Sequence, residues 1–158
     1  MSTLTILAIA LAALAFAFVL FVLVPKALLK GMRQSLEARV KGRLSAGATL
    51  VYEDYTANSF GVESRGVTQW RGNGALILTE KSLAFFQLFV EQELVIPLER
   101  VQALSLVHKH LGKATPSQLL RVEFRARERL DAVAFWVPRP SELKALIEAR
   151  LPQPQAQS

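Results

Sequence analysis

The chain has 158 residues, of which 51% are hydrophobic, and it carries 19 lysines and arginines against 13 aspartates and glutamates. The hydrophobic residues are concentrated near the start, because residues 4–24 contain no charged side chain. This composition excludes a purely soluble protein. The sequence has no cysteine, which excludes disulfide bonds, thiolate catalysis and thiolate metal sites.

Residues 4–24 predict a transmembrane helix. These 21 consecutive uncharged residues would span roughly 31 Å as a helix, about the thickness of the hydrocarbon core of a bilayer. We therefore expect a membrane anchor over residues 1–25. The main alternative is a cleaved secretory signal, which needs a positive leader, a shorter apolar core and a small-residue cleavage site. The segment has none of these, so an uncleaved anchor is favoured.

A basic cluster follows the apolar run and predicts its orientation. Residues 26–43 hold six cations and one anion, whereas residues 44–158 hold 13 cations and 12 anions. Cations beside a span favour retention of that end in the cytoplasm, so we expect the N-terminus outside and the rest of the chain at the cytoplasmic face of the inner or plasma membrane. Because the remainder is nearly neutral, nucleic acid is not an expected partner. The membrane-flanking cations are Lys26, Lys30, Arg33, Arg39, Lys41 and Arg43.

An amphipathic juxtamembrane helix is predicted over residues 26–46. Its apolar positions recur every four residues, at Leu28, Met32, Leu36, Val40 and Leu44. A period of four makes a wide, slanted stripe around a helix, which is more typical of a surface-lying or domain-packing helix than of a coiled coil. Two interpretations stay open: a stalk that rests on the lipid headgroups, or a helix that pairs with a partner or a second copy.

Short segments of strand-forming residues follow, separated by turn residues. Residues 75–79 and 82–86 are separated by only two residues, so these two segments can pair only in the antiparallel sense, and with the other segments they predict a meander of about seven strands. The segments lie at residues 48–52, 62–70, 75–79, 82–86, 93–96, 101–108, 119–126 and 132–137.

A C-terminal amphipathic helix is predicted over residues 141–151. Ser141 is the expected N-cap, and the apolar face is formed by Leu143, Leu146, Ile147 and Leu151. Such a helix can plug the open end of a curled sheet. The fold class is therefore a transmembrane helix plus a mainly β (α+β) domain, and residues 152–158 are expected to form a disordered tail.

Neither a catalytic nor a metal site is predicted. His108 and His110 would project to the same side of a strand, but no third ligand lies near them in sequence, so a surface pair is favoured. The glycines of residues 72–74 lack the G-K-[ST] ending of a phosphate loop and precede a strand, so a turn explains them. We expect no cofactor, no metal and no enzymatic activity.

One strand and its following turn carry a basic face. The face carries four cations and one anion, Arg121, Glu123, Arg125, Arg127 and Arg129, the first four of which alternate with Val122, Phe124 and Ala126. This pattern indicates either solvated polar side chains or a contact for an anionic surface. A second candidate contact is the apolar stretch of residues 86–90, which lies in a connection and would suit a partner or membrane. Aromatic side chains could line a groove, although core packing is favoured; they are Trp70, Phe85, Phe86, Phe89, Phe135 and Trp136.

Three short motifs resemble the GRAM and bacterial PH-like domains. They are G-N-G-A-L-I-L-T at residues 72–79, L-A-F-F at residues 83–86 and L-V-I-P-L-E-R-V at residues 94–101. The similarity covers residues 47–151. It implies a PH-like fold, in which two nearly orthogonal antiparallel sheets of about seven strands are capped by a C-terminal helix.

The resemblance also implies a function class. Domains of this kind are non-catalytic modules that bind lipids, peptides or proteins. The phosphoinositide-binding members use a basic loop between their first two strands, whereas the stretch expected there, residues 53–61, contains Glu53 and Asp54 and no lysine or arginine. We therefore expect a single-pass membrane protein that presents a binding or scaffolding module for a protein or lipid ligand. The alternatives are a structural subunit of a larger membrane complex or a small membrane-tethered enzyme.

Overall fold

The computed structural model describes residues 2–44, 47–66 and 71–152, and the chain divides into two compact units, Met1–Ser35 and Leu36–Ser158. The first unit is helical. It contains α1 (Thr3–Phe18), a π-helical turn (Val19–Leu23) and the first part of α2 (Val24–Leu44).

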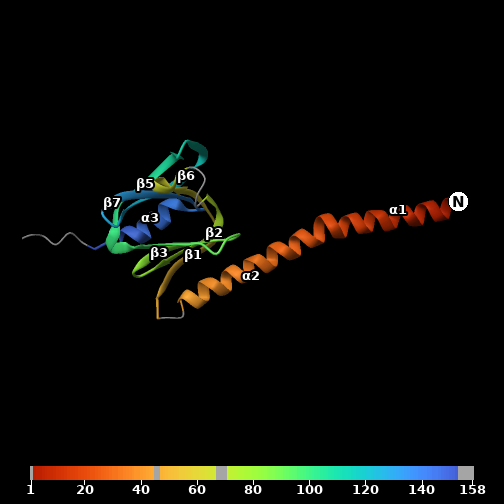
Figure 1. Ribbon diagram of the computed structural model, residues 1–158, viewed down its shortest axis with the longest axis horizontal. Helices are drawn as coiled ribbons and strands as arrows, with labels where there is room; N and C mark the ends of the chain where they lie inside the picture. Colours follow the sequence, from red (N-terminus) through yellow and green to blue (C-terminus); the bar gives the residue numbers. More distant parts are fainter. Residues whose placement is uncertain (1, 45–46, 67–70, 153–158) are drawn as a thin grey trace, which may run out of the picture. The chain divides into compact units, whose positions relative to one another are not determined.

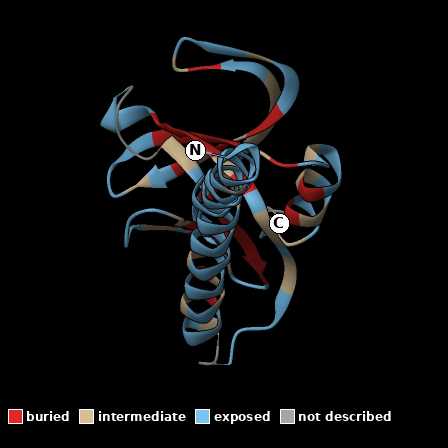
Figure 2. Ribbon diagram, turned by 90° about the vertical axis from the view of Figure 1, so that its right-hand side faces the viewer, coloured by how far each residue is buried: buried red, intermediate tan, exposed pale blue. Residues whose placement is uncertain are grey.

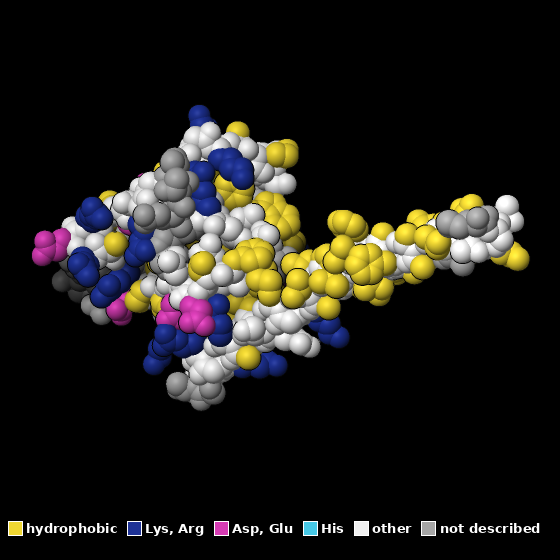
Figure 3. Space-filling model, turned by 45° about the vertical axis from the view of Figure 1, so that its right-hand side comes forward, with side chains coloured by type: hydrophobic (Ala, Val, Ile, Leu, Met, Phe, Trp, Pro, Cys, Tyr) yellow, Lys and Arg dark blue, Asp and Glu magenta, His cyan; other side chains and the backbone are white. Residues whose placement is uncertain are grey.

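The continuous helix Thr3–Leu44 contains an 18-residue window with a mean hydropathy of 3.1, and none of that window is buried. Hydrophobic side chains lie along the N-terminal part of this helix on the face that Figure 3 shows. Within the described residues it is the one helix that is long and apolar enough to cross a membrane. The predicted C-terminal tail beyond residue 152 lies outside the described residues.

The second unit is a seven-stranded antiparallel sheet followed by a helix (Figure 1), so the predicted fold class is confirmed. The strand order is β4-β3-β2-β1-β7-β6-β5. The strands are β1 (Leu50–Val62), β2 (Arg71–Thr79), β3 (Ser82–Gln87), β4 (Glu93–Pro97), β5 (Val101–His110), β6 (Lys113–Ala126) and β7 (Arg129–Trp136), and the helix is α3 (Pro140–Glu148).

Strand β1 joins the two halves of the sheet. It pairs with β2 along most of its length and with β7 through Asn58↔Trp136 and Ser59↔Phe135. Register shifts interrupt both pairings, and such bulges bend a strand and increase its twist. The resemblance implied two sheets, whereas the structure has one continuous hydrogen-bonded sheet that is shared through β1.

The hydrophobic core lies between the two halves of this sheet and α3. Phe85 of β3 and Phe135 of β7 are fully buried, and their ring centroids lie 5.4 Å apart. Helix α3 adds Leu143 and Ile147, which belong to the same cluster. Figure 2 shows the buried residues on the strands and on one face of α3. The helix therefore closes the core, as the sequence predicted.

The first two predicted strands are partly wrong. Residues 53–61, which were expected to form a loop, belong to β1. A strand was also predicted over residues 62–70, but Glu63–Arg65 forms a 3-10 turn, and residues 67–70 lie outside the described residues. Polar residues and bulges break the regular alternation of β1, which explains the error. For example, the Asp54 carboxylate accepts a hydrogen bond from the Thr56 backbone N–H at 2.7 Å.

The glycines predicted to form a turn lie in strand β2 instead. Gly72 pairs with Ser59, and Gly74 pairs with Ala57. A Cβ atom at Gly74 would lie 2.1 Å from the Phe86 carbonyl oxygen, so glycine is required for the close approach of β2 and β3.

The connection between the predicted strand segments 101–108 and 119–126 is also shorter in the structure. Leu111 and Gly112 have φ angles of 45° and 79° and form a two-residue turn between β5 and β6. Positive φ at both central positions is typical of a type I′ hairpin turn. Strand β6 therefore begins at Lys113.

Helix α3 begins and ends earlier than predicted. The N-cap is Arg139, with Pro140 in the first turn, so Ser141 is not the cap. The helix ends at Glu148, and Leu151 packs against the core from beyond the helix. The predicted apolar face still provides the contact with the sheet.

The end of α2 packs on the outer face of the sheet, within the second unit. Leu36 and Val40 are 1% and 0% exposed. They form a cluster with alternate residues of β2 and β3, namely Ala75, Ile77, Ala84 and Phe86. Leu36 and Val40 belong to the predicted amphipathic stripe, which was expected to contact lipid headgroups, a partner or a second copy. In the structure these two residues contact the sheet instead.

Candidate binding surfaces

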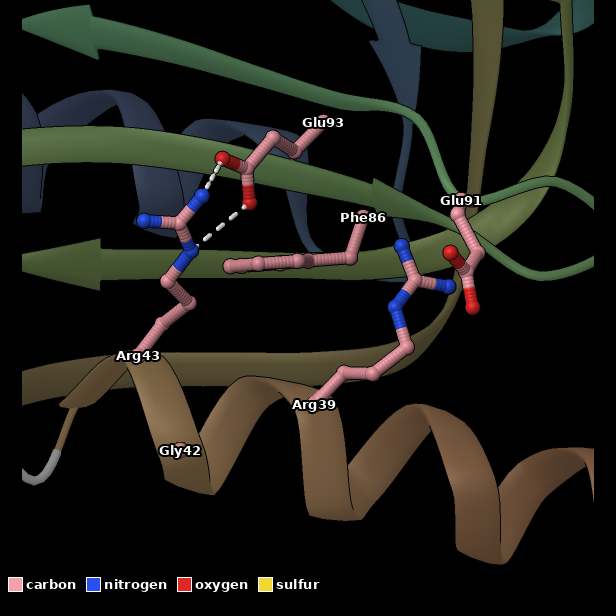
Figure 4. A pocket seen from close by; sticks show the side chains of 6 residues that line it. All are labelled: Arg39, Gly42, Arg43, Phe86, Glu91 and Glu93. Carbon is pink, nitrogen blue, oxygen red and sulfur yellow. Dashed lines mark hydrogen bonds and ion pairs between the residues drawn. The ribbon is translucent and has the colours of Figure 1, made fainter.

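Two arginines of α2 attach this helix to the β3–β4 hairpin (Figure 4). Arg39 donates hydrogen bonds from Nη1 to the carbonyl oxygens of Gln87 and Val90, at 3.1 and 3.5 Å. Arg43 donates two hydrogen bonds to the carboxylate of Glu93. Two of the cations predicted to flank the membrane therefore contact the β3–β4 hairpin. Lys26, Lys30 and Arg33 lie in the first unit, and Lys41 is exposed.

The hollow between these side chains has a volume of about 390 Å³ and is lined by Arg39, Arg43, Phe86, Glu91 and Glu93, with Gly42 at its base. The Phe86 side chain lies between the two arginines (Figure 4). Because the lining includes as many carboxylates as guanidinium groups, the hollow has no excess charge that would attract an ion. It is best described as the contact between α2 and the hairpin.

Arg121 forms ion pairs with two glutamates of the domain. Its Nη2 lies 2.9 Å from Oε1 of Glu63, and its Nη1 forms a second ion pair with Glu123. Burial disfavours the charged guanidinium, but the hydrogen bonds to Glu63 and Glu123 outweigh it and raise the pKa of Arg121. The structure thus separates this residue from the other arginines of the predicted basic face.

The other three arginines of that face gather at the turn between β6 and β7. Arg125, Arg127 and Arg129 are exposed, and in the part of the chain that the structure describes no carboxylate lies within 4 Å of their side-chain nitrogens. Leu130 beside them is 62% exposed. We call Arg125, Arg127 and Arg129 the basic hairpin tip.

The two histidines do not form the predicted surface pair. His108 is exposed, whereas His110 is buried, with its Nε2 2.9 Å from the carbonyl oxygen of Gly61. A register shift between Val107 and Lys109 separates them and explains why residues two apart differ in burial. Burial lowers the pKa of His110. Among the described residues no group of three or more metal-ligating side chains could hold a metal ion.

A buried carboxylate fixes the turn that follows β1. Asp131 of β7 accepts hydrogen bonds from the Ser64 backbone N–H at 3.0 Å and from its hydroxyl group at 2.5 Å. Asp131 is 7% exposed. This arrangement anchors the 3-10 turn to β7 and satisfies the buried charge.

The apolar stretch of residues 86–90 forms the end of the β3–β4 hairpin. Phe86 is buried, whereas Phe89 and Val90 are 62% and 42% exposed. Core packing, the favoured interpretation of the aromatic side chains, is confirmed for Phe85 and Phe135, which are fully buried, and Trp136 is half-buried. Trp70 lies outside the described residues.

Sequence reasoning missed one hollow, which we call the Arg71–Lys113 hollow. It has a volume of about 210 Å³. The side chains come from the end of β1 and the starts of β2 and β6, and Lys113 had been assigned to a loop, so no sequence pattern connects them. The lining residues are Asn58, Ser59, Phe60, Arg71, Gly72 and Lys113.

The connection between β1 and β2 is also not the one expected from the resemblance. The acidic residues Glu53 and Asp54 lie in β1, and the connection begins at Glu63 and contains Arg65. The sequence argument against phosphoinositide binding relied on the lack of basic residues in residues 53–61. Because those residues lie in β1, that argument does not apply to the connection between β1 and β2.

No family model matches the chain, and no curated protein matches it. Solved structures do resemble it. A chain of "The 8S snRNP Assembly Intermediate" is 9% identical with a TM-score of 0.53, over 69% of this chain and 89% of that chain. The C-terminal domain of an unknown protein from Leishmania infantum is 11% identical with a TM-score of 0.51, over 72% of this chain and 95% of that chain.

The Vps36 N-terminal PH domain is 12% identical with a TM-score of 0.47, over 65% of this chain and 81% of that chain. At such identities these likenesses concern the fold alone. Seven antiparallel strands that meet at β1 and are closed by a C-terminal helix form the PH-like architecture that the resemblance implied. Membership of the GRAM family stays a prediction.

Proposed function

We propose that this chain is a single-pass membrane protein that presents a non-catalytic PH-like binding module at the cytoplasmic face of the inner or plasma membrane. The exposed apolar helix is the observation that carries the proposal. Its most apolar window has a mean hydropathy of 3.1 with no part buried, so in water it would expose a large apolar surface at a high cost in free energy. In a bilayer the same surface is favourable.

The basic residues after the span support the orientation. Lys26, Lys30 and Arg33 lie in the first unit, shortly after the apolar run. Cations on this side of the run favour an outside N-terminus and a cytoplasmic module.

We further propose that the basic hairpin tip is the contact of the module with an anionic surface. Three arginines without an acidic partner within 4 Å among the described residues, together with the exposed Leu130, provide both charge and apolar area at one turn. Such a tip suits a layer of anionic phospholipid headgroups or an acidic protein segment.

A second candidate function is that of a structural subunit in a larger membrane complex. The specific observation in its favour is the exposed apolar pair Phe89 and Val90 at the β3–β4 hairpin. Exposed apolar side chains at a hairpin end suit a protein partner. Stoichiometric cross-linking of the full chain in native membranes would favour this function.

Anchoring is tested by alkaline carbonate extraction of membranes that contain the full chain. We expect the chain to stay in the membrane pellet, and a variant with both Leu11→Arg and Leu14→Arg to be released, because each arginine opposes insertion of the helix. A tag after Ser158 should resist protease added to intact cells. Release of the unmodified chain, or a mature chain that begins after Val24, would contradict the anchor.

The ligand contact is tested with the unit Leu36–Ser158 and vesicles of phosphatidylglycerol. We expect Arg125→Glu combined with Arg127→Glu to reduce binding at least about tenfold, because each cation near an anionic surface contributes about 1 kcal/mol. Lys81→Glu combined with Lys109→Glu is the matched control, since both lysines are exposed and the change in net charge is the same. Equal losses in the two variants would indicate that only net charge matters.

A further inference from the structure

The Arg71–Lys113 hollow brings together two cations from strands that are distant in the sequence. Both side chains line the same space of about 210 Å³. Within residues 2–44, 47–66 and 71–152, no carboxylate lies within 4 Å of the side-chain nitrogens of either residue. Two like charges that share a hollow repel each other, and an anion between them would remove that repulsion.

The guanidinium group of Arg71 is held in place by the backbone. Its Nε donates to the carbonyl oxygen of Phe60 and its Nη2 to that of Leu111, both at 3.0 Å. A guanidinium group has five N–H donors, so three remain after these two bonds. The side chain is therefore fixed before any ligand arrives, and the entropy cost of ordering it on binding is small.

The ammonium group of Lys113 is also positioned, because its Nζ lies 5.1 Å from the centroid of the Phe60 ring. A cation–π contact of this kind is weak at an exposed site and leaves the three N–H donors of the lysine available. Phe60 thus orders both cations, one through its carbonyl oxygen and the other through its ring.

The remaining walls suit an oxyanion. Gly72 has a φ of 139°, a conformation that favours glycine, and it contributes no side chain that would fill the space. Asn58 and Ser59 also line the hollow. The Ser59 Oγ accepts a hydrogen bond from the Gly61 N–H at 3.3 Å, so its own O–H is left to donate.

We propose that the Arg71–Lys113 hollow binds a phosphoryl group of the phosphate monoester type. Arginine offers parallel N–H donors that match two phosphate oxygens, and lysine adds a point charge for a third. The monoester can belong to a soluble molecule or to a lipid headgroup, and the chemistry of recognition is the same. This site is separate from the basic hairpin tip and does not depend on the membrane anchor.

The test uses the full chain in detergent micelles and isothermal titration at constant ionic strength. The probes are inorganic phosphate and the water-soluble lipid dioctanoyl phosphatidic acid. We expect saturable binding of at least one probe, and we expect Lys113→Gln to weaken it about tenfold, because a hydrogen bond to a charged group is lost. Binding of inorganic phosphate would indicate a soluble ligand, and binding of phosphatidic acid alone would indicate a lipid; both results support the site.

Matched variants keep the test decisive. Lys109→Gln changes an exposed lysine of the same hairpin, and Arg127→Gln changes the basic hairpin tip; both should bind the probes normally. Arg71→Lys keeps the charge but loses the paired donors, so binding should weaken. If that variant does not fold, Lys113→Glu, which places a carboxylate beside Arg71, should abolish binding while circular dichroism stays unchanged. No saturable binding of either probe, or equal effects of Lys113→Gln and Lys109→Gln, would overturn the proposal.

Discussion

The packing of α2 on the sheet predicts a large effect of one substitution, Leu36→Ala. The Leu36 side chain is 1% exposed, and the substitution removes three buried carbons. At about 0.8 kcal/mol per carbon group, the lost transfer free energy is about 2.4 kcal/mol. The cavity left against the sheet increases the cost further, so we expect a decrease of about 3–4 kcal/mol in the free energy of unfolding. This is a substantial part of the stability of an ordinary domain.

Urea unfolding of residues 26–158, followed by circular dichroism, would measure this decrease. Leu28→Ala is the matched control, because it makes the same chemical change on the same helix at a residue that is 63% exposed. We expect the control to change the free energy of unfolding by less than about 0.5 kcal/mol. Equal effects of the two substitutions would refute the packing of α2 on the sheet, and with it the assignment of residues 36–44 to the domain.

Two further predictions concern the interior of the domain and use the same unfolding measurement. Burial lowers the pKa of His110 from its ordinary value of 6.5. As the pH falls below about 6.5, the unfolded state therefore binds more protons than the folded state. The free energy of unfolding should then decrease from pH 7.5 to pH 5.5. His110→Gln should flatten this dependence and His108→Gln, at an exposed residue, should not; an unchanged slope in His110→Gln would assign the effect to other groups. Gly74→Ala should cost more than about 3 kcal/mol, because its methyl group would overlap the neighbouring strand. The control is Gly31→Ala, at an exposed helix position with open space around it, which should be neutral or stabilising by up to about 1 kcal/mol. A comparable loss of stability in Gly74→Ala and Gly31→Ala would contradict the close approach of β2 and β3.

Periodicity predicted most of the regular elements of the second unit. The apolar positions every four residues placed Leu36 and Val40 on one face of a helix, and both are buried. The hairpin of β2 and β3 was predicted at residues 75–79 and 82–86, where the two strands pair. These elements depend on local pattern, which a sequence displays directly.

One local signal was present but was not used. Residues 75–78 of β2 and residues 83–86 of β3 are buried without interruption, and their sequences are apolar at every position. A strand that is apolar on both faces indicates that both faces are covered. This pattern could have predicted a helix on the outer face of the sheet.

The sites could not be predicted, because they depend on contacts between distant residues. Arg121 is neutralised by Glu63, which lies on another element. The Arg71–Lys113 hollow requires β1, β2 and the β5–β6 turn to meet. The alternating sequence pattern assigned four arginines to one face, but only the fold separates Arg121, which forms ion pairs, from the three arginines at the basic hairpin tip.

The position of β1 in the sheet has a consequence for how the chain acquires its structure. Asn58 of β1 pairs with Trp136 of β7, which lies far along the sequence, so a nascent chain that has not yet released β7 from the ribosome cannot complete the sheet. Pairing between such distant segments is also slow, since loop closure precedes the stabilising contacts. The apolar segment of α1 emerges long before that moment. Synthesis therefore delivers the N-terminal helix first, and the domain can complete its sheet only after β7 has also emerged.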